Sequence, residues 1–398
     1  MRIATAQLFE QGLREIADLQ AKAARAQSEV ATGKRILTAA DDPAAAAQVL
    51  NGRDLLAQTQ RFDSNINTAR SRLDLEESVL TNVGNVLQRV RELAVRANNA
   101  TLDNNDRAAI AAELEERLEE LLSLANTRAS GGEYIFSGFQ SHTRPFTRSA
   151  AGSFDYNGDQ GQRFVRVSPS TQIAVNDSGS EVFRDIRNGN GTFAVGAAAS
   201  NTGSAVIDNG SVTNPTLWIA DNYSINFISA TNYEVRDSGG AVIASGSYGE
   251  GDTISFSGIE VTVTGAPAAG DTLFVAPSAN QNLFQTVDNL IQTLGISAAD
   301  GPSQAAITQG VNRALGDLDQ AVDNILVTRT TIGARLSALE QEQEVNADMQ
   351  VQFQKIITDL EDVDLTEAAS RLSRELFALE AAQQSFIRIQ NLSLFSFL

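Results

Sequence analysis

The stretch FDSNINTARSRLDLEESVLTNVGNVLQRVRELAVRA, residues 62–97, decides the fold of this chain. Steps of four and three residues alternate along it and connect a row of positions in which only Glu76 is not apolar. The apolar positions are Phe62, Ile66, Ala69, Leu73, Leu80, Val83, Leu87, Val90, Ala94 and Ala97. This spacing is the heptad pattern of a helix that packs against another helix, and it lasts for about five heptads. The pattern predicts a long helix over 59–98 with a partner along its length.

Apolar residues follow a similar helical spacing in four other segments, and each of these stripes needs a partner helix. A helix over 106–126 carries Ile110, Leu114, Leu118, Leu121 and Ala125. The N-terminal stripe consists of Phe9, Leu13, Ile16, Leu19, Ala23, Ala26 and Val30. The two C-terminal stripes consist of Leu318, Val322, Ile325, Ile332, Leu336 and Leu339, and of Leu365, Ala369, Leu372, Leu376, Leu379 and Phe386. The simplest partner for the N-terminal stripe is a C-terminal one, so we expect the two ends of the chain to lie together.

The middle of the chain has a different composition. Six of the seven prolines lie between Pro145 and Pro302, and the only tryptophan is Trp218. Short runs of alternating polarity predict strands; they cover 223–227, 233–235, 253–256 and 259–263. Turn formers separate such runs, for example at 209–210 and 237–240. The sequence therefore predicts a β-rich insertion between two helical arms.

These observations predict an α+β fold. A long helical coiled coil or bundle is made from both chain termini, and an all-β outer domain is inserted into it. We expect an N-terminal axial helix and turn over 1–43, a long helical core over 44–145 and a β-rich outer domain over 146–282. The helical core returns over 283–364, and a C-terminal axial helix covers 365–398.

Composition excludes several classes of function. The 398 residues include 49 acidic and 30 basic ones, a formal charge of −19, which repels nucleic acids and anionic membranes. Cysteine is absent and His142 is the only histidine, so thiol catalysis and zinc-enzyme sites cannot be assembled. No apolar run is long enough for a membrane span, and residues 1–7 do not read as a cleaved signal peptide. We expect no enzyme activity, cofactor or metal, in a protein that is cytosolic or exported without a cleaved signal.

Three short motifs permit a chemical and a structural interpretation. The carboxylates of Asp41 and Asp42 could serve a metal or acid–base chemistry, but Asp42 followed by Pro43 is typical of a helix start, and Gly33 of a helix end. Residues 155–159 faintly resemble a calcium loop but lack its spacing, so a turn between strands is favoured. Residues 188–191 are glycine-rich but lack the Gly-Lys-Ser/Thr of a phosphate loop.

The C-terminus ends in the apolar run LSLFSFL, residues 392–398. Burial of each large side chain stabilises by about 1.5–3 kcal/mol, so an end this apolar should be covered by a partner. The stripes therefore fit either an ordinary intramolecular bundle or packing between subunits of an assembly, and the C-terminus favours the second.

Four terminal segments carry a resemblance. ATGKRI at 31–36 with DDPA at 41–44, and IGARL at 332–336 with DLEDVDL at 359–365, resemble the terminal signatures of bacterial flagellin-like proteins. Within that family, GEYIFSG at 132–138, TRPF at 143–146 and YNGD at 156–159 look like the hook–filament junction branch. Residues 192–280 make the chain longer than typical members and resemble β modules of some hook-associated proteins.

The resemblance implies a structural adaptor that joins hook-associated protein 1 to flagellin at the hook–filament junction. It further implies a ring-like or helical homo-oligomer, export by the flagellar type III route to the outside of the cell, and a cytoplasmic export chaperone that covers the C-terminal helix. Flagellin and hook-associated protein 1 remain as alternatives, although the motif at 132–146 argues against flagellin. A binding module without catalysis, for example for sugars, is a further alternative for residues 192–280.

The same resemblance implies two sets of functional residues. The expected axial assembly and chaperone interface consists of Phe9, Leu13, Ile16, Leu372, Leu376, Leu379, Phe386, Ile389, Leu392, Leu394, Phe395 and Leu398. The family motif positions are Gly33, Asp41, Asp42, Pro43, Gly132, Tyr134, Phe136, Gly138, Pro145 and Phe146.

Overall fold

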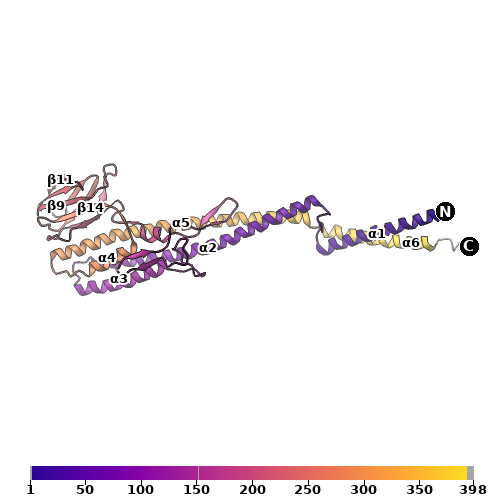
Figure 1. Ribbon diagram of the computed structural model, residues 1–398, viewed down its shortest axis with the longest axis horizontal. Coiled ribbons are helices and arrows are strands. Elements are labelled where there is room, and N and C mark those ends of the chain that lie inside the picture. The colour runs from indigo at the N-terminus through magenta and orange to yellow at the C-terminus, as the bar shows by residue number, and fades with distance from the viewer. Residues whose placement is uncertain (1, 151, 392–398) are drawn as a thin grey trace. The chain divides into compact units, whose positions relative to one another are not determined.

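A computed structural model describes residues 2–150 and 152–391 of the chain (Figure 1). The chain divides into two compact units, residues 1–64 with 341–398, and residues 65–340. The helices are α1 (Arg2–Thr32), α2 (Pro43–Ala97), α3 (Asn104–Ala125), α4 (Leu283–Leu294), α5 (Gly301–Glu361) and α6 (Leu365–Asn391). No helix within the described ranges combines the length and the apolarity that a bilayer crossing needs.

The helix ends follow the local sequence. Gly33 directly follows α1 with a φ of 71°, a left-handed conformation that glycine adopts without strain. The Asp42 carboxylate accepts the backbone N–H of Ala45 at 3.0 Å, and Pro43 is the first residue of α2. Asp364 caps α6 in the same way, because its carboxylate accepts the N–H of Thr366 at 2.8 Å. The structural interpretation of 33–43 is therefore confirmed.

In the first unit, α1 and α6 run antiparallel and side by side (Figure 1). Ala23 and Ala26 of α1 and Ala368 of α6 are buried, so small side chains allow the two helices to approach closely. The expectation that the two ends of the chain lie together is confirmed.

In the second unit, a hydrophobic core joins parts of α2, α3, α4 and α5. The heptad positions predicted from residues 62–97 are all buried, Glu76 among them; all of them except Phe62 belong to this unit. The stripe predicted for 106–126 is buried along α3, and the Asp103 side chain caps that helix. Of the stripe predicted for 318–339, Leu318, Ile325, Ile332 and Leu339 are buried, while Val322 and Leu336 pack against the core from its edge.

Strands occupy much of the chain between α3 and α4. Five short strands and one π-helical turn pack on the helical core: β1 (Phe146–Arg148), β2 (Phe154–Tyr156), β3 (Phe164–Arg166), β4 (Gln172–Ala174), η1 (Ser180–Arg184) and β5 (Ile186–Arg187). The remaining strands are β6 (Phe193–Ala197), β7 (Val206–Ile207), β8 (Ser211–Val212), β9 (Tyr223–Ser229), β10 (Asn232–Arg236), β11 (Val242–Ser247), β12 (Thr253–Phe256), β13 (Ile259–Thr264), β14 (Thr272–Pro277) and β15 (Asn280–Gln281). The four runs predicted from alternation lie in β9, β10, β12 and β13, which confirms them.

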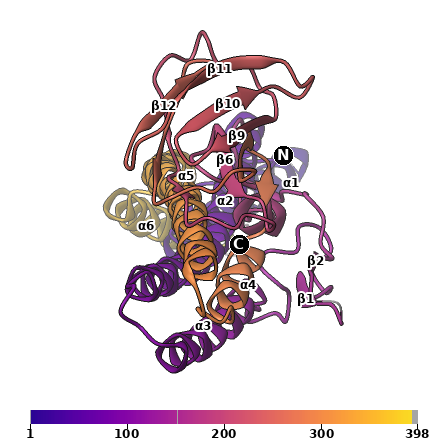
Figure 2. The same cartoon turned by 90° about the vertical axis from the view of Figure 1, so that its left-hand side faces the viewer.

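Strands β6–β14 form a β module with its own core. A five-stranded antiparallel sheet has the order β11-β10-β9-β14-β6, and a four-stranded one is built around β13. A second hydrophobic core fills the module, with Phe193, Ile225 and Leu273 fully buried in it. Figure 2 shows the module on the side of α5 that is opposite to α3.

Hydrogen bonds fix the β module to α5. The Asp317 carboxylate of α5 accepts the backbone N–H of Gly189 at 2.7 Å, and the Gln309 amide oxygen accepts the N–H of Ile207 at 2.9 Å. Asp317 and Gln309 are buried, so these bonds are shielded from water. Burial raises the pKa of Asp317, although the hydrogen bond from Gly189 opposes the rise.

Candidate functional site

The seam between α1 and α6 is the first candidate surface for assembly. The rings of Phe9 and Phe386 lie 5.0 Å apart, and Phe386 covers Gly12 so closely that a β-carbon there would lie 2.9 Å from its ring. Glycine at position 12 therefore lets the aromatic ring seat against the backbone of α1. This contact ties the two helices together near their outer ends.

The seam differs from the predicted stripes in two ways. Glu29, not Val30, takes the buried position after Ala26, where its carboxylate pairs with Arg25 and with Arg371 of α6. In α6, Leu365 and Leu376 are exposed rather than packed, because the buried face passes through Ala368 instead. The prediction that the N-terminal and C-terminal stripes form the seam was therefore wrong at Val30, Leu365 and Leu376.

The residues expected for axial assembly divide into three groups. Phe9, Leu13 and Leu376 are about half exposed, while Ile16, Leu372, Leu379 and Phe386 are partly buried in the seam. Ile389, Leu392, Leu394, Phe395 and Leu398 lie outside the residues whose side chains the structure describes.

Exposed apolar side chains line the rest of α6. Phe377 is 74% exposed and Ile387 is 55% exposed, and neither belongs to the stripe predicted from the sequence. With the exposed Phe9, Leu13 and Leu376 they give this small helix pair an unusual amount of apolar surface in water. Burial of this apolar surface against another protein would be energetically favourable.

The joint between α1 and α2 is held by a carboxylate that sequence patterns did not indicate. Glu361, the last residue of α5, accepts from Lys34 at 2.7 Å and from Arg53 at 2.5 Å. Backbone bonds run alongside, from Arg35 N–H to the Glu361 carbonyl and from Val363 N–H to the Gly33 carbonyl. Burial opposes ionisation of Glu361, but the bonds from Lys34 and Arg53 outweigh it and lower the pKa of the carboxyl.

Substitution of Glu361→Gln is expected to loosen this joint by about 1–2 kcal/mol, because charge-assisted hydrogen bonds to two cations are lost. Hydrogen–deuterium exchange of the Arg35 and Val363 amides should then become faster. In the wild type the pKa of Glu361 is lower in the folded state than its ordinary value. The stabilisation is therefore fully present at pH values above the ordinary glutamate pKa, and it is lost as the pH falls through the folded pKa. Glu367→Gln, an exposed change in the first turn of α6, is the control. Equal exchange in the two variants would contradict the assignment.

The two acidic motif residues at this joint act on the backbone. Asp41 accepts the N–H groups of Thr38 and Leu37 at 2.8 and 3.0 Å, and the bond from Thr38 lowers the pKa of Asp41 most. Asp42 caps α2. Their carboxylates are thus occupied with turn and cap formation.

The motif at 132–146 builds a core rather than a reactive site. Gly132 and Gly138 have φ values of 80° and 68°, and a β-carbon on Gly138 would lie 2.3 Å from the Asp159 carbonyl oxygen. Arg128 donates to the Tyr134 hydroxyl at 2.6 Å. Pro145 is buried beside Phe146.

The two motif phenylalanines enter one aromatic cluster. Phe136 contacts Phe183 with ring centroids 5.0 Å apart, and Phe146 contacts Phe284 of α4 at the same separation. Edge-to-face contacts of this kind stabilise beyond simple burial. The motif therefore fastens the loops after α3 onto α4.

A network of buried charges lies beneath this motif. Arg335 of α5 holds Asp177 in a bidentate pair, with both N–O distances at 2.9 Å. The Asp177 backbone N–H donates to Glu76 at 3.1 Å, and Glu76 is only 1% exposed. Burial, and then the charge of Asp177, raise the pKa of Glu76 well above the usual glutamate value. The network fastens α2, α5 and the chain after β4 to one another.

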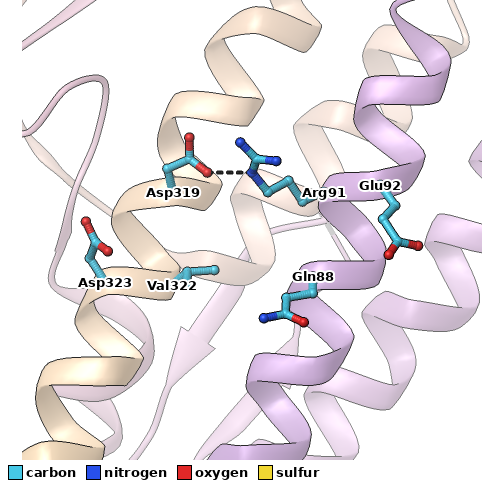
Figure 3. Close-up of a pocket in the computed structure, with 6 residues that line it drawn as sticks. All are labelled: Gln88, Arg91, Glu92, Asp319, Val322 and Asp323. Atoms are coloured by element: carbon cyan, nitrogen blue, oxygen red, sulfur yellow. Dashed lines mark hydrogen bonds and ion pairs between the residues drawn. The ribbon is translucent and has the colours of Figure 1, made fainter.

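A shallow pocket between α2 and α5 is lined by Gln88, Arg91, Glu92, Asp319, Val322 and Asp323 (Figure 3). Arg91 donates to Asp319 at 2.7 Å, and this hydrogen bond raises the pKa of Arg91. The lining offers neither a nucleophile with a base nor a set of metal ligands. Across the described residues, no three His, Cys, Asp or Glu side chains are grouped so that they could hold a metal ion.

The remaining candidate motifs have structural environments. His142 is exposed. The Asp159 carboxylate accepts the N–H groups of Phe139 and Gly161, each at 2.8 Å, and so closes the turn after β2. Residues 188–191 form the turn before β6, at the attachment of the β module.

Comparison with known proteins gives a consistent family. The model of the bacterial flagellin N-terminal helical region matches residues 3–141, and that of the C-terminal helical region matches residues 315–398. The model of the D2-like domain of flagellar hook-associated protein 1 matches residues 197–277, within the β module.

Relatives that span the chain point to one branch. Flagellar hook-associated protein 3 of Escherichia coli K12 is 26% identical over 403 residues, which cover 99% of each chain. The solved structure of flagellar hook-associated protein 3 from Legionella pneumophila is 34% identical with a TM-score of 0.75, and covers 78% of this chain and 98% of that one. FlgL of Xanthomonas campestris is 34% identical with a TM-score of 0.73, and covers 76% and 98%.

Proposed function

The chain belongs to the family of flagellar hook-associated protein 3, the hook–filament junction proteins, and we propose that it joins hook-associated protein 1 to flagellin there as an adaptor. It is a structural protein of the flagellum, and flagellin is not favoured as its identity. Its relatives are structural flagellar proteins rather than known enzymes.

One observation supports assembly through the terminal helices. The pair of α1 and α6 is held together by small residues and one aromatic contact, yet it leaves Leu13, Leu376, Phe377 and Ile387 in water. Burial of such side chains contributes about 1.5–3 kcal/mol each, which is enough to drive packing between subunits. We propose that this surface packs in a ring-like or helical homo-oligomer with its hook-side and filament-side neighbours.

The same surface supports a proposal about export. A helix with exposed Phe377 and Ile387 would aggregate in the cytoplasm unless it is covered. A cytoplasmic chaperone that covers α6, and passage to the cell exterior through the flagellar type III channel, would resolve this problem.

Phe377→Ser is expected to reduce incorporation at the junction about tenfold or more, because each subunit loses one large apolar contact. Helix content should stay unchanged, since the side chain is 74% exposed. Immunogold electron microscopy with an antibody against residues 192–280 measures this as the loss of a single labelled band between hook and filament. Label along the whole filament of the wild type would instead indicate a flagellin.

The matched control is Phe139→Ser, which removes an exposed phenylalanine from the other unit. It should leave the band in place. The same two variants test the chaperone proposal by pull-down from the cytoplasm, where only Phe377→Ser should weaken capture. If both variants keep the band, α6 does not form the assembly surface.

A further inference from the structure

Two connections join the β module to the helical core. The entering connection, residues 188–192, leads from β5 into β6, and the returning connection, residues 278–282, leads from β14 through β15 to α4. The two connections are bonded to each other: the side-chain oxygen of Asn188 accepts the backbone N–H of Ala279 at 2.9 Å, and the Ser278 hydroxyl donates to the Asn188 carbonyl at 2.7 Å. We name residues 188–192 and 278–282 together the neck of the module.

One carboxylate of α5 receives a hydrogen bond from each side of the neck. The backbone N–H of Gly189, in the entering connection, donates to Oδ1 of Asp317 at 2.7 Å. The side-chain amide of Gln281, in the returning connection, donates to Oδ2 of the same residue at 3.0 Å. Asp317 is only 4% exposed, so both bonds are shielded from water, and the charge of the carboxylate strengthens them. Asp317 therefore holds both ends of the module against one point of α5.

The geometry on each side of the neck suits this shared acceptor. Gly189 has a φ of 64°, and a β-carbon there would lie 2.2 Å from the carbonyl oxygen of Phe193, so only glycine allows this close turn. The amide nitrogen of Gln281 also donates to the Thr286 hydroxyl at 2.7 Å, which fixes the direction of its N–H groups. Both donors are therefore oriented by their own surroundings.

The carboxylate of Asp317 depends on these donors because a nearby cation does not replace them. Arg313 lies one turn earlier on α5, but its Nε is 3.9 Å from Asp317 Oδ2, which is longer than a hydrogen bond, and its side chain is about half exposed. A buried carboxylate without hydrogen-bond donors is costly. Contact between the neck and Asp317 is therefore favourable for both.

The other side-chain hydrogen bonds described above or printed for this contact are neutral and lie outside the neck. The Gln309 amide oxygen accepts the N–H of Ile207, and the Asn209 side chain donates to the backbone carbonyl of Asn312 at 3.1 Å. Each of them reaches the module at a single point after β6. Asp317 differs from them because it joins the two connections.

We propose that Asp317 is a positioning residue for the β module, because its carboxylate bridges the two connections and so fixes the direction in which the module projects from α5. Without the bridge, the neck is held mainly by its own bonds, and the module is expected to sample a wider range of directions. This role goes beyond the proposed function, because it involves neither α1 nor α6.

The absence of cysteine from the chain allows a direct test in the full-length protein. Ser255→Cys on β12 and Thr330→Cys on α5 provide two exposed sites for spin labels, and pulsed electron–electron double resonance gives the distribution of distances between them. Added to this pair, Asp317→Ala is expected to broaden the distribution about twofold or more, because both connections lose their acceptor. Asp319→Ala is the matched control, since that carboxylate lies on the same helix but bonds to Arg91 of α2.

An exchange of donor and acceptor tests the bridge itself. At pH 8, Gln281→Glu alone sets two carboxylates against each other and is expected to broaden the distribution. Gln281→Glu combined with Asp317→Asn restores a donor and an acceptor, since the introduced amide can donate to the introduced carboxylate while its oxygen still accepts from Gly189. The double variant should therefore regain the narrow distribution, which a mere loss of packing would not allow.

Three results would overturn the proposal: an equally narrow distribution for Asp317→Ala and Asp319→Ala with both variants folded by circular dichroism, a wild-type distribution for Gln281→Glu, or a double variant as broad as Gln281→Glu alone. If Asp317→Ala did not fold, the two variants at Gln281 would still decide the question. Failure of the Phe377→Ser test at the junction would leave this proposal standing, because the distances are measured in the purified chain.

Discussion

Substitution of Leu87→Asp is expected to destabilise residues 65–340 by about 5 kcal/mol or more, which is enough to unfold a marginally stable unit. Leu87 lies on the heptad face of α2 and is fully buried in the core that joins α2, α3, α4 and α5. Shortening a buried leucine to alanine alone costs about 2–5 kcal/mol, and aspartate adds an unpaired charge to that loss. Thermal unfolding followed by circular dichroism at 222 nm measures the effect.

The matched control lies on the same helix. Val95→Asp makes a similar change two turns later, where the side chain is about half exposed. It is expected to change the free energy of unfolding by about 0.5 kcal/mol or less. If the two variants melted at the same temperature, the heptad face would not be the core of this unit.

This core is also where sequence reasoning succeeded. Burial selects apolar side chains at the helical period, so the row from Phe62 to Ala97 could be followed without any tertiary information. The caps at Asp42 and Gly33 were predictable for a similar reason, because they depend on the geometry of a few neighbouring residues. Strands β9, β10, β12 and β13 followed from alternation.

Contacts between distant residues were not predictable. Glu76 was visible only as the one acidic residue on an apolar seam. Its neighbour Asp177 is 101 residues away, and Arg335 is a further 158 residues along. Glu29 replaces Val30 in the α1 seam because Arg371 lies across from it, and that requires knowledge of how α6 is placed. The joint at Glu361 was not predictable for the same reason, because its partners Lys34 and Arg53 are distant in the sequence.

The candidate surfaces also combine features that the local sequence predicts with features that depend on tertiary structure. Phe377 and Ile387 lie off the regular stripes, so no pattern singled them out, and only their exposure beside the seam does so. In the β module, alternation predicts which side of each strand faces out. The tertiary structure then decides that Asp317 of α5 meets both connections of the module.

Removal of the positive charge of Arg335, which lies beneath the motif at 132–146, gives the second large expected effect on stability. Arg335→Met is expected to cost about 3–5 kcal/mol, because it leaves the buried Asp177 without its bidentate partner and close to Glu76. Arg329→Met is the control, since Arg329 forms a similar pair on the same helix with Glu77, but both side chains are partly exposed. That change should cost about 1 kcal/mol or less. Urea unfolding of the two variants compares them directly.

The pH dependence of Arg335→Met distinguishes a charge effect from lost packing. Around Glu76 lie Arg72 of the same helix, Asp177, Arg335 of α5, Arg163 just before β3, and Glu133 with Tyr134 of the motif loop. A carboxyl whose folded pKa is raised is stabilising in its protonated form. Its contribution is therefore full below the ordinary glutamate pKa and is lost as the pH rises through the folded pKa. Without Arg335 this dependence should become steeper, so the variant should be weakest at alkaline pH.

Glu76→Gln distinguishes the contribution of the Glu76 carboxyl to stability from that of the Asp177 carboxyl. The amide keeps an oxygen that can accept the Asp177 N–H but carries no charge, so in the wild-type background it should raise stability at pH 8 and flatten the pH profile. Combined with Arg335→Met, it should recover part of the lost stability, because one of the two buried charges is removed. If Arg335→Met lost the same free energy at pH 5 and pH 8, with or without Glu76→Gln, then Arg335 would act through its packing alone. A loss that grows with pH and shrinks with Glu76→Gln requires that the three side chains act as one charged unit.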